Sequence, residues 1–202
     1  MKNHHTRTYG LLCVLGGLIY LGTGVLATAL PRDFGNSAPP VAWLSIVLAA
    51  MHALTLAGAI GLARSGATGK GPLAKIGLVL AGLGTAAAVV AEPMFLGPSG
   101  VAEPLIQFGT LIAALGLVMA GIAVWRARRW LDARRYVPLA LGLYFLVVFM
   151  PWLIAAGEPN FLVLGCWGAL WALLGLSLVR DANAPTAAGD VAAARAGQAA
   201  SV

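Results

Sequence analysis

Charged residues are scarce in this chain. Lys, Arg, Asp and Glu make up 10% of the 202 residues and hydrophobic residues make up 60%, whereas a soluble domain carries roughly 25% charged residues. A soluble core needs only stripes of apolar side chains, but a helix in lipid must be apolar on nearly every face for roughly 20 residues. The scarcity of charge therefore excludes an ordinary soluble domain and indicates a polytopic membrane protein.

Residues for metal, haem or redox chemistry are also few. The two cysteines, Cys13 and Cys166, stand in separate apolar runs and form no Cys-x-x-Cys pair, so neither a redox dithiol nor a structural zinc site is expected. His52 is the only histidine inside an apolar run, which excludes a haem held by two intramembrane histidines of one chain. No phosphate-binding loop or serine-hydrolase elbow occurs, and we predict no cofactor and no metal site.

Six long apolar runs account for most of the sequence. They lack the alternation of apolar and polar residues that a membrane barrel needs, so each is predicted to be a helix. The first run, at about 22 residues, exceeds the 7–15 residues of a signal-peptide core and is assigned as a helix too. We predict an all-α membrane protein, a six-transmembrane-helix bundle over residues 1–180 followed by a disordered cytoplasmic tail over 181–202, with helices at about 9–30, 41–63, 72–91, 105–125, 137–156 and 161–179.

The charges lie between these runs, with opposite signs in alternate gaps. Twelve of the 13 basic residues lie at the two termini, between the second and third runs, and between the fourth and fifth, where three acids leave a net charge of +9. The other gaps hold one basic and four acidic residues, a net charge of −3. By the positive-inside rule both termini are predicted to be cytoplasmic, in the plasma or inner membrane of the cell.

The densest basic cluster spans residues 125–136, between the fourth and fifth runs. Its position between two membrane helices favours an anchor for lipid headgroups over a nucleic-acid surface. We expect Trp125, Trp130 and Tyr136 at the membrane interface. Membrane lipids are thus the predicted partners, no nucleic acid is expected, and the sequence leaves the oligomeric state open.

Three glutamates next to prolines are the candidate catalytic residues: Glu92, Glu103 and Glu158. Glu92 lies near the apolar boundary, where desolvation favours the neutral form and suits a proton donor or an ion ligand; alternatively, Pro93 ends the helix and Glu92 faces water. Proline is expected to push Glu103 and Glu158 out of the helical region, so that they cap the following helices. Either these acids converge in one outer cleft or they serve only as caps.

His52 lies about 11 residues into its predicted helix, near the centre of a bilayer. An ionisable residue at that depth is a candidate functional group. Its imidazole could instead be satisfied by a helix carbonyl or by the hydroxyl of Tyr20, Thr85 or Tyr144. Direct pairing with Glu92 is not expected, because that residue lies near the outer edge.

Aromatic residues gather in the last two runs. Pro151 is expected to kink the fifth helix, and Trp152 beside it suits the membrane interface. Trp167 and Trp171 lie deeper at a spacing of four residues, where they line either the core or an apolar pocket. With His52, these three tryptophans are the predicted substrate-binding residues.

Small residues recur four positions apart and permit close contacts between helices. With 26 glycines in the chain, packing within the chain is a better explanation of these spacings than dimerisation. The pairs are Ala57 and Gly61, Gly77 and Ala81, Gly116 and Ala120, and Gly168 and Ala172.

The favoured function is to bind or transform a lipophilic small molecule in a pocket open toward the outer leaflet. Carboxylate acid–base chemistry of the cyclase or isomerase type would fit, in the general outline of small integral-membrane isoprenoid enzymes, although no motif of such a family is found. The alternatives are a small-solute or cation transporter or sensor, with His52 as a relay, and a non-catalytic membrane subunit. The sequence leaves open whether the chain is an enzyme.

Overall fold

A computed structural model describes residues 2–29, 42–97, 100–157 and 160–184. Within these residues the chain is helical and contains no strand. Six helical segments are long and apolar enough to cross a membrane, which confirms the predicted number of apolar helices. The elements are α1 (Lys2–Ala29), α2 (Ala42–Ser65), α3 (Pro72–Met94), α4 (Ala102–Ala127), η2 (Ala133–Tyr136), α5 (Val137–Tyr144), η3 (Phe145–Phe149), α6 (Met150–Ala156) and α7 (Phe161–Asn183).

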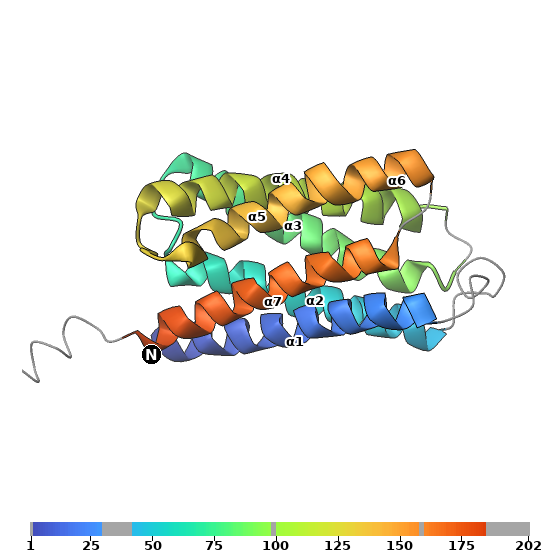
Figure 1. The fold of residues 1–202 in the computed structure, drawn as a ribbon, viewed down its shortest axis with the longest axis horizontal. Helices are drawn as coiled ribbons and strands as arrows, with labels where there is room; N and C mark the ends of the chain where they lie inside the picture. Colours follow the sequence, from blue (N-terminus) through green and yellow to red (C-terminus); the bar gives the residue numbers. More distant parts are fainter. Residues whose placement is uncertain (1, 30–41, 98–99, 158–159, 185–202) are drawn as a thin grey trace, which may run out of the picture.

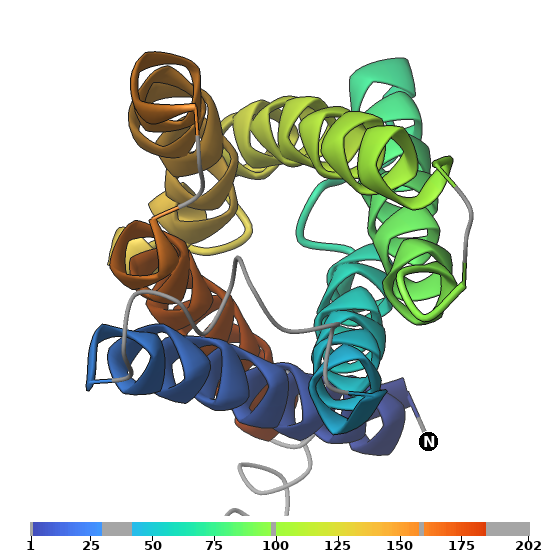
Figure 2. The same cartoon turned by 90° about the vertical axis from the view of Figure 1, so that its right-hand side faces the viewer.

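The long helices lie side by side in an elongated bundle (Figure 1). Each packs on its neighbour in the chain, and α7 packs on α1, so the helices form a closed ring. Figure 2 shows this ring from one end and shows the helices inclined to the long axis of the bundle. Residues that point into the ring from non-adjacent helices can therefore meet at its centre.

Several helices extend beyond the predicted limits. The first helix begins at Lys2, not at Tyr9, because no proline or glycine stands in its polar first turns. The last continues to Asn183, so the start of the predicted tail is helical; the rest of that tail, from residue 185, lies outside the described residues.

Prolines near helix ends have less effect than expected. Pro93 lies inside α3, which continues to Met94. Glu103 is helical, in the first turn of α4, with Pro104 beside it, so the expectation that proline would push Glu103 out of the helix is wrong. A proline in the first turn is tolerated because the N–H that it lacks would have no helical acceptor there.

The fifth span is interrupted. Between α5 and α6, residues Phe145–Phe149 form a π-helical turn, η3, in which the Met150 N–H donates to the Phe145 carbonyl. Pro151 follows directly and cannot donate to the carbonyl four residues back. The irregularity thus lies next to the predicted kink, and α6 beyond it has no buried residue.

Glycines seven residues apart form the closest helix contacts. Gly10 and Gly17 of α1 lie against Gly175 and Gly168 of α7, so close that a Cβ on any of them would collide with the facing helix. The spacing of seven keeps both glycines on one face of the helix. Close contact replaces bulky side chains here, as is common between helices in membranes.

The same arrangement joins α3 to α4. Gly77 and Gly84 lie against Gly116 and Gly109, again seven residues apart on each helix. The predicted use of small residues for packing within the chain therefore holds for this pair of helices.

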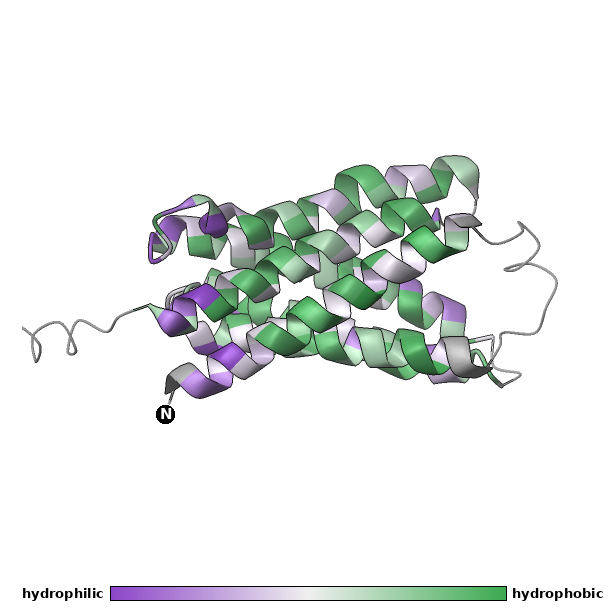
Figure 3. Ribbon diagram, turned by 60° about the horizontal axis from the view of Figure 1, so that its bottom comes forward, coloured by the Kyte–Doolittle hydropathy of each residue, from purple (hydrophilic) through white to green (hydrophobic). Residues whose placement is uncertain are grey.

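Hydrophilic residues gather at the end of the bundle that carries the N-terminus (Figure 3). We call it the basic end, because Arg64, Lys70 and the arginines of residues 126–135 lie there. Trp125 is half exposed, but Trp130 is only 1% exposed and its indole Nε1–H donates to Asp181 Oδ1 over 2.9 Å. The Trp130 side chain therefore packs against the protein and does not face outward, since Asp181 at the end of α7 provides an acceptor for its indole N–H.

Candidate functional site

Three helices bring polar side chains together inside the bundle. His52 of α2 lies with its Nδ1 atom 3.3 Å from Oε1 of Glu92, on α3. The Tyr20 hydroxyl, on α1, lies 3.4 Å from the other imidazole nitrogen, Nε2. Each of the three residues is only 4% exposed. We call Tyr20, His52 and Glu92 the polar triad.

The hydrogen bonds restrict where protons can sit in the triad. His52 Nδ1 also lies 3.0 Å from the Leu48 carbonyl oxygen, which can only accept, so Nδ1 carries a proton. Nε2 accepts from the Tyr20 hydroxyl when the ring is neutral and donates to it when the ring is protonated. The imidazole can therefore gain or lose one proton without breaking any of these contacts.

The pairing of His52 with Glu92 corrects the expectation from sequence. Counted from the basic end at 1.5 Å per residue, His52 lies at about 20 Å and Glu92 at about 30 Å. Helix side chains lean toward the N-terminus of their own helix. Because α2 and α3 are antiparallel, the two side chains lean toward each other, and the inclination of the helices (Figure 2) reduces the difference in height further.

One of the three hydroxyls proposed as partners of His52 does contact it. Tyr20 approaches the imidazole, whereas the Thr85 hydroxyl donates to the Ala81 carbonyl at 2.8 Å and the Tyr144 hydroxyl donates to the Val163 carbonyl at 2.9 Å. The sequence named the correct residue among three, but could not select it.

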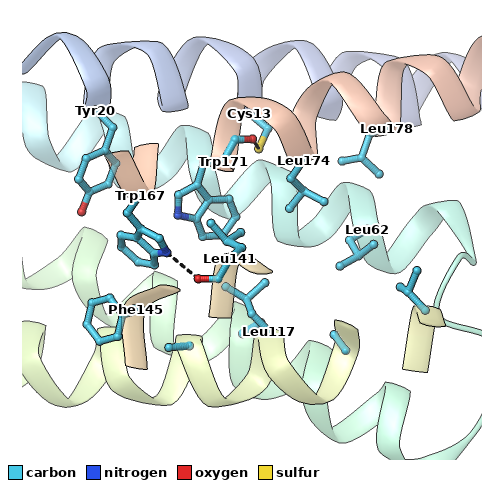
Figure 4. Packing of buried hydrophobic residues seen from close by; sticks show 14 of the residues in the cluster. Cys13, Tyr20, Leu62, Leu117, Leu141, Phe145, Trp167, Trp171, Leu174 and Leu178 are labelled. Atoms are coloured by element: carbon cyan, nitrogen blue, oxygen red, sulfur yellow. Dashed lines mark hydrogen bonds between the residues drawn. The ribbon is translucent and has the colours of Figure 1, made fainter. Parts of the chain in front are cut away.

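Aromatic rings adjoin the triad on one side. The ring of Tyr20 lies 5.7 Å from that of Trp167 between centroids, edge to face, and Trp167 lies 4.9 Å from Phe145 and 5.9 Å from Trp171. Phe149 stacks on Phe145 at 5.0 Å. Figure 4 shows this side of the core, where the rings of Tyr20, Trp167 and Phe145 lie in a row. We call Tyr20, Phe145, Phe149, Trp167 and Trp171 the aromatic cluster.

The two predicted tryptophans differ in their polar contacts. The Trp167 indole N–H donates to the Leu141 carbonyl at 2.9 Å (Figure 4). The Trp171 indole N–H is buried and has no acceptor among the described residues. A buried donor without an acceptor is costly, so Trp171 offers a ligand a hydrogen-bond donor within the cluster.

The remaining predicted site residues do not join this group. Glu103 is exposed, and its carboxylate accepts a hydrogen bond from the Gln107 side chain at 3.1 Å. It therefore differs from Glu92, whose side chain is buried. Trp152 is 46% exposed on α6. Glu158 lies outside the described residues, and its convergence with Glu92 stays a prediction.

The aromatic pattern of the last two apolar runs includes Phe149, but it does not indicate Phe145 as a member of the cluster. A regular helix would place residues four apart on nearly the same face, and the π-helical turn keeps both rings buried. The sequence contains no local pattern that predicts this turn, although Pro151 lies just after it.

The described residues contain no group of three or more His, Cys, Asp and Glu side chains that could hold a metal ion. Cys13 and Cys166 are both free thiols. Two hollows of about 200 and 190 Å³ lie at the basic end. Neither contains a predicted site residue; they are lined by His4, Arg7, Ala182 and Asn183, and by Trp125, Arg126 and Arg128.

Comparisons of the chain with protein-family models, curated proteins and solved structures find no match. The candidate function therefore depends on the polar triad and the aromatic cluster.

Proposed function

We propose that this chain is a six-span protein of the plasma or inner membrane, with both termini in the cytoplasm. Three features support this placement: the lengths of the apolar helices, the gathering of hydrophilic residues at the end that carries the N-terminus (Figure 3), and the basic residues in the gaps on that side. In that orientation Glu92 lies toward the outer side, and His52 lies nearer the centre of the membrane.

We further propose that the polar triad acts as an acid–base centre for a lipophilic small molecule, in a reaction of the isomerase or cyclase type. The observation that carries this proposal is the buried contact of 3.3 Å between His52 and Glu92 beside the aromatic cluster. A buried acid paired with a base can hold one proton and release it to a substrate that excludes water.

An isomerisation shows how the chemistry balances. A proton released by the polar triad forms a new C–H bond at one carbon of a double bond and leaves a carbocation on the other. A C–H bond on a carbon next to the cation then breaks, its electron pair forms the new double bond, and its proton returns to the triad. The site ends as it began, and no oxidant or reductant is consumed.

The alternative as a transporter of small hydrophilic solutes has less support. Such a path needs free polar groups along its length, but the buried hydroxyls of Thr55, Thr85 and Ser177 donate to carbonyls of their own helices. A single polar centre next to aromatic rings suits a lipophilic ligand better.

Deuterium exchange tests the proposal even though the substrate is unidentified. The purified protein, in lipid nanodiscs, is incubated in D2O with a total lipid extract of its host membrane, and the lipids are analysed by mass spectrometry. We expect at least one lipophilic molecule to gain carbon-bound deuterium with the unaltered protein and not with Glu92→Gln or His52→Ala.

Glu103→Gln is the matched control, because Glu103 is also a glutamate followed by proline but is exposed. It should exchange deuterium like the unaltered protein. Equal incorporation with Glu92→Gln, or none with the unaltered protein, would contradict an acid–base role for the triad.

A further inference from the structure

The buried interior has an imbalance of charge. Among the described residues, the buried set includes one acid, Glu92, and neither lysine nor arginine. With His52 neutral, an ionised Glu92 leaves one negative charge surrounded by apolar side chains. An isolated charge in such surroundings is costly, so the site is stabilised by a proton or by another cation.

The aromatic cluster supplies a second attraction for positive charge. The faces of aromatic rings carry negative potential, and rings of Tyr and Trp bind organic cations within about 6 Å of their centres. Tyr20 belongs to both the polar triad and the aromatic cluster, so the pair of His52 and Glu92 is contiguous with the rings. Two independent features thus favour a positively charged ligand.

The ligand set does not suit calcium or magnesium. Calcium takes 6–8 oxygen ligands and magnesium requires an octahedral shell, whereas the triad offers the Glu92 carboxylate and one hydroxyl, on Tyr20. A cation whose charge is spread over apolar groups needs few oxygen ligands and gains from contact with rings.

A single turn of the chain, η3, covers one side of the aromatic cluster. Phe145 and Phe149 of η3 are buried, whereas Val147 and Val148 of the same turn are exposed. The next element, α6, continues from η3 in the same span and buries none of its own residues. The η3 turn therefore separates the buried rings from the outside of the bundle.

We infer that the site binds a lipophilic organic cation, whose positive charge is stabilised by Glu92 and by the rings of Tyr20, Phe145 and Trp167. This inference rests on the proposed function for the location of the site, and it specifies the ligand. The inference also applies to the proposed isomerisation, because the carbocation of that reaction is a lipophilic cation formed at the same place.

Two ions of nearly equal size and shape but opposite charge provide the probe. Binding of tetraphenylphosphonium and of tetraphenylborate is measured by equilibrium dialysis against the protein in zwitterionic nanodiscs, with empty nanodiscs to subtract partition into lipid. We expect saturable binding of tetraphenylphosphonium about tenfold or more tighter than that of tetraphenylborate, a difference of about 1.4 kcal/mol.

Variants of Glu92 and Glu103 test which carboxylate binds tetraphenylphosphonium. Glu92→Gln should weaken tetraphenylphosphonium binding about tenfold, whereas Glu92→Asp, which keeps the charge, and Glu103→Gln, on the surface, should preserve it. Equal binding of the two ions by the unaltered protein overturns the inference, and that result needs no variant to fold. Unchanged binding by Glu92→Gln also overturns it.

The two proposals can fail separately. Deuterium exchange that depends on Glu92, without selective binding of the cation, would retain the acid–base function and overturn this inference. Selective cation binding without deuterium exchange would retain the inference and overturn the acid–base function.

Discussion

At the residue scale, His52 and Glu92 contribute differently to the contact between them. Glu92 brings the charge, and His52 brings the group that can neutralise it. Removing one partner of a buried pair leaves the other uncompensated, whereas removing both charges is often nearly neutral. The energetic role of each residue can therefore be separated by mutation.

We predict that His52→Leu lowers the free energy of unfolding by about 3 kcal/mol, because Glu92 is left buried without its partner. The double variant His52→Leu with Glu92→Gln should be more stable than His52→Leu alone. Reversible unfolding in mixed micelles measures both.

Glu103→Gln serves as the surface control and should change the stability by no more than about 0.5 kcal/mol. If the effects of His52→Leu and Glu92→Gln simply add, the two residues are not coupled and the pair is energetically irrelevant.

At the scale of the elements, glycine determines which helices pack most closely. The contacts of α1 with α7 and of α3 with α4 depend on glycines that repeat every seven residues, and both pairs are antiparallel neighbours in the ring. Gly22 of α1 and Gly82 of α3 lie on the same helices but have open space where a Cβ would stand. The chain thus contains its own controls.

We predict that Gly17→Ala and Gly84→Ala each destabilise the protein by about 2 kcal/mol, because the added methyl group meets facing backbone and forces the helices apart. Gly22→Ala and Gly82→Ala should leave stability unchanged or raise it by up to about 1 kcal/mol, since alanine favours helix. Thermal unfolding followed by size-exclusion chromatography distinguishes the pairs. Similar melting temperatures for all four variants would show that the glycine contacts do not determine packing.

At the scale of the whole molecule, charge among the described residues lies mainly at the ends of the bundle, and Glu92 is the one acid of these residues that is buried. The basic end holds the N-terminus and the C-terminal end of α7 (Figure 1), and hydrophilic residues gather there (Figure 3). At that same end, Trp130 and Asp181 join the turn after α4 to α7, and Arg134 lowers the pKa of the neighbouring Asp132 through a side-chain hydrogen bond. The polar triad remains separated from this end by a large part of the bundle.

Cysteine labelling tests the orientation that we propose. In a background with Cys13→Ala and Cys166→Ala, we predict that Val101→Cys reacts with a membrane-impermeant maleimide on intact cells, whereas Lys70→Cys reacts only after permeabilisation. Both residues are exposed and lie in connections between the long helices. The positive-inside rule places Lys70 in the cytoplasm. The reverse pattern of labelling would invert the proposed topology.

The number and type of the long elements follow from the sequence alone. Transfer of a side chain into apolar surroundings depends mainly on that side chain, so the six runs and the charged gaps can be read locally. Even the use of glycines such as Gly77 and Gly116 for packing within the chain was predictable, because a small residue permits close approach whichever helix it meets.

Which side chains meet depends on the arrangement of the helices in the fold. The contact of His52 with Glu92 depends on the relative heights of two antiparallel helices and on the direction in which their side chains lean. The burial of Trp130 depends on the position of Asp181, which is 51 residues away in the chain. Such contacts involve partners distant in sequence, whereas hydropathy and charge are properties of each segment alone. The sequence could therefore name His52, Glu92 and Tyr20 as candidates, and the fold alone joined them into one site.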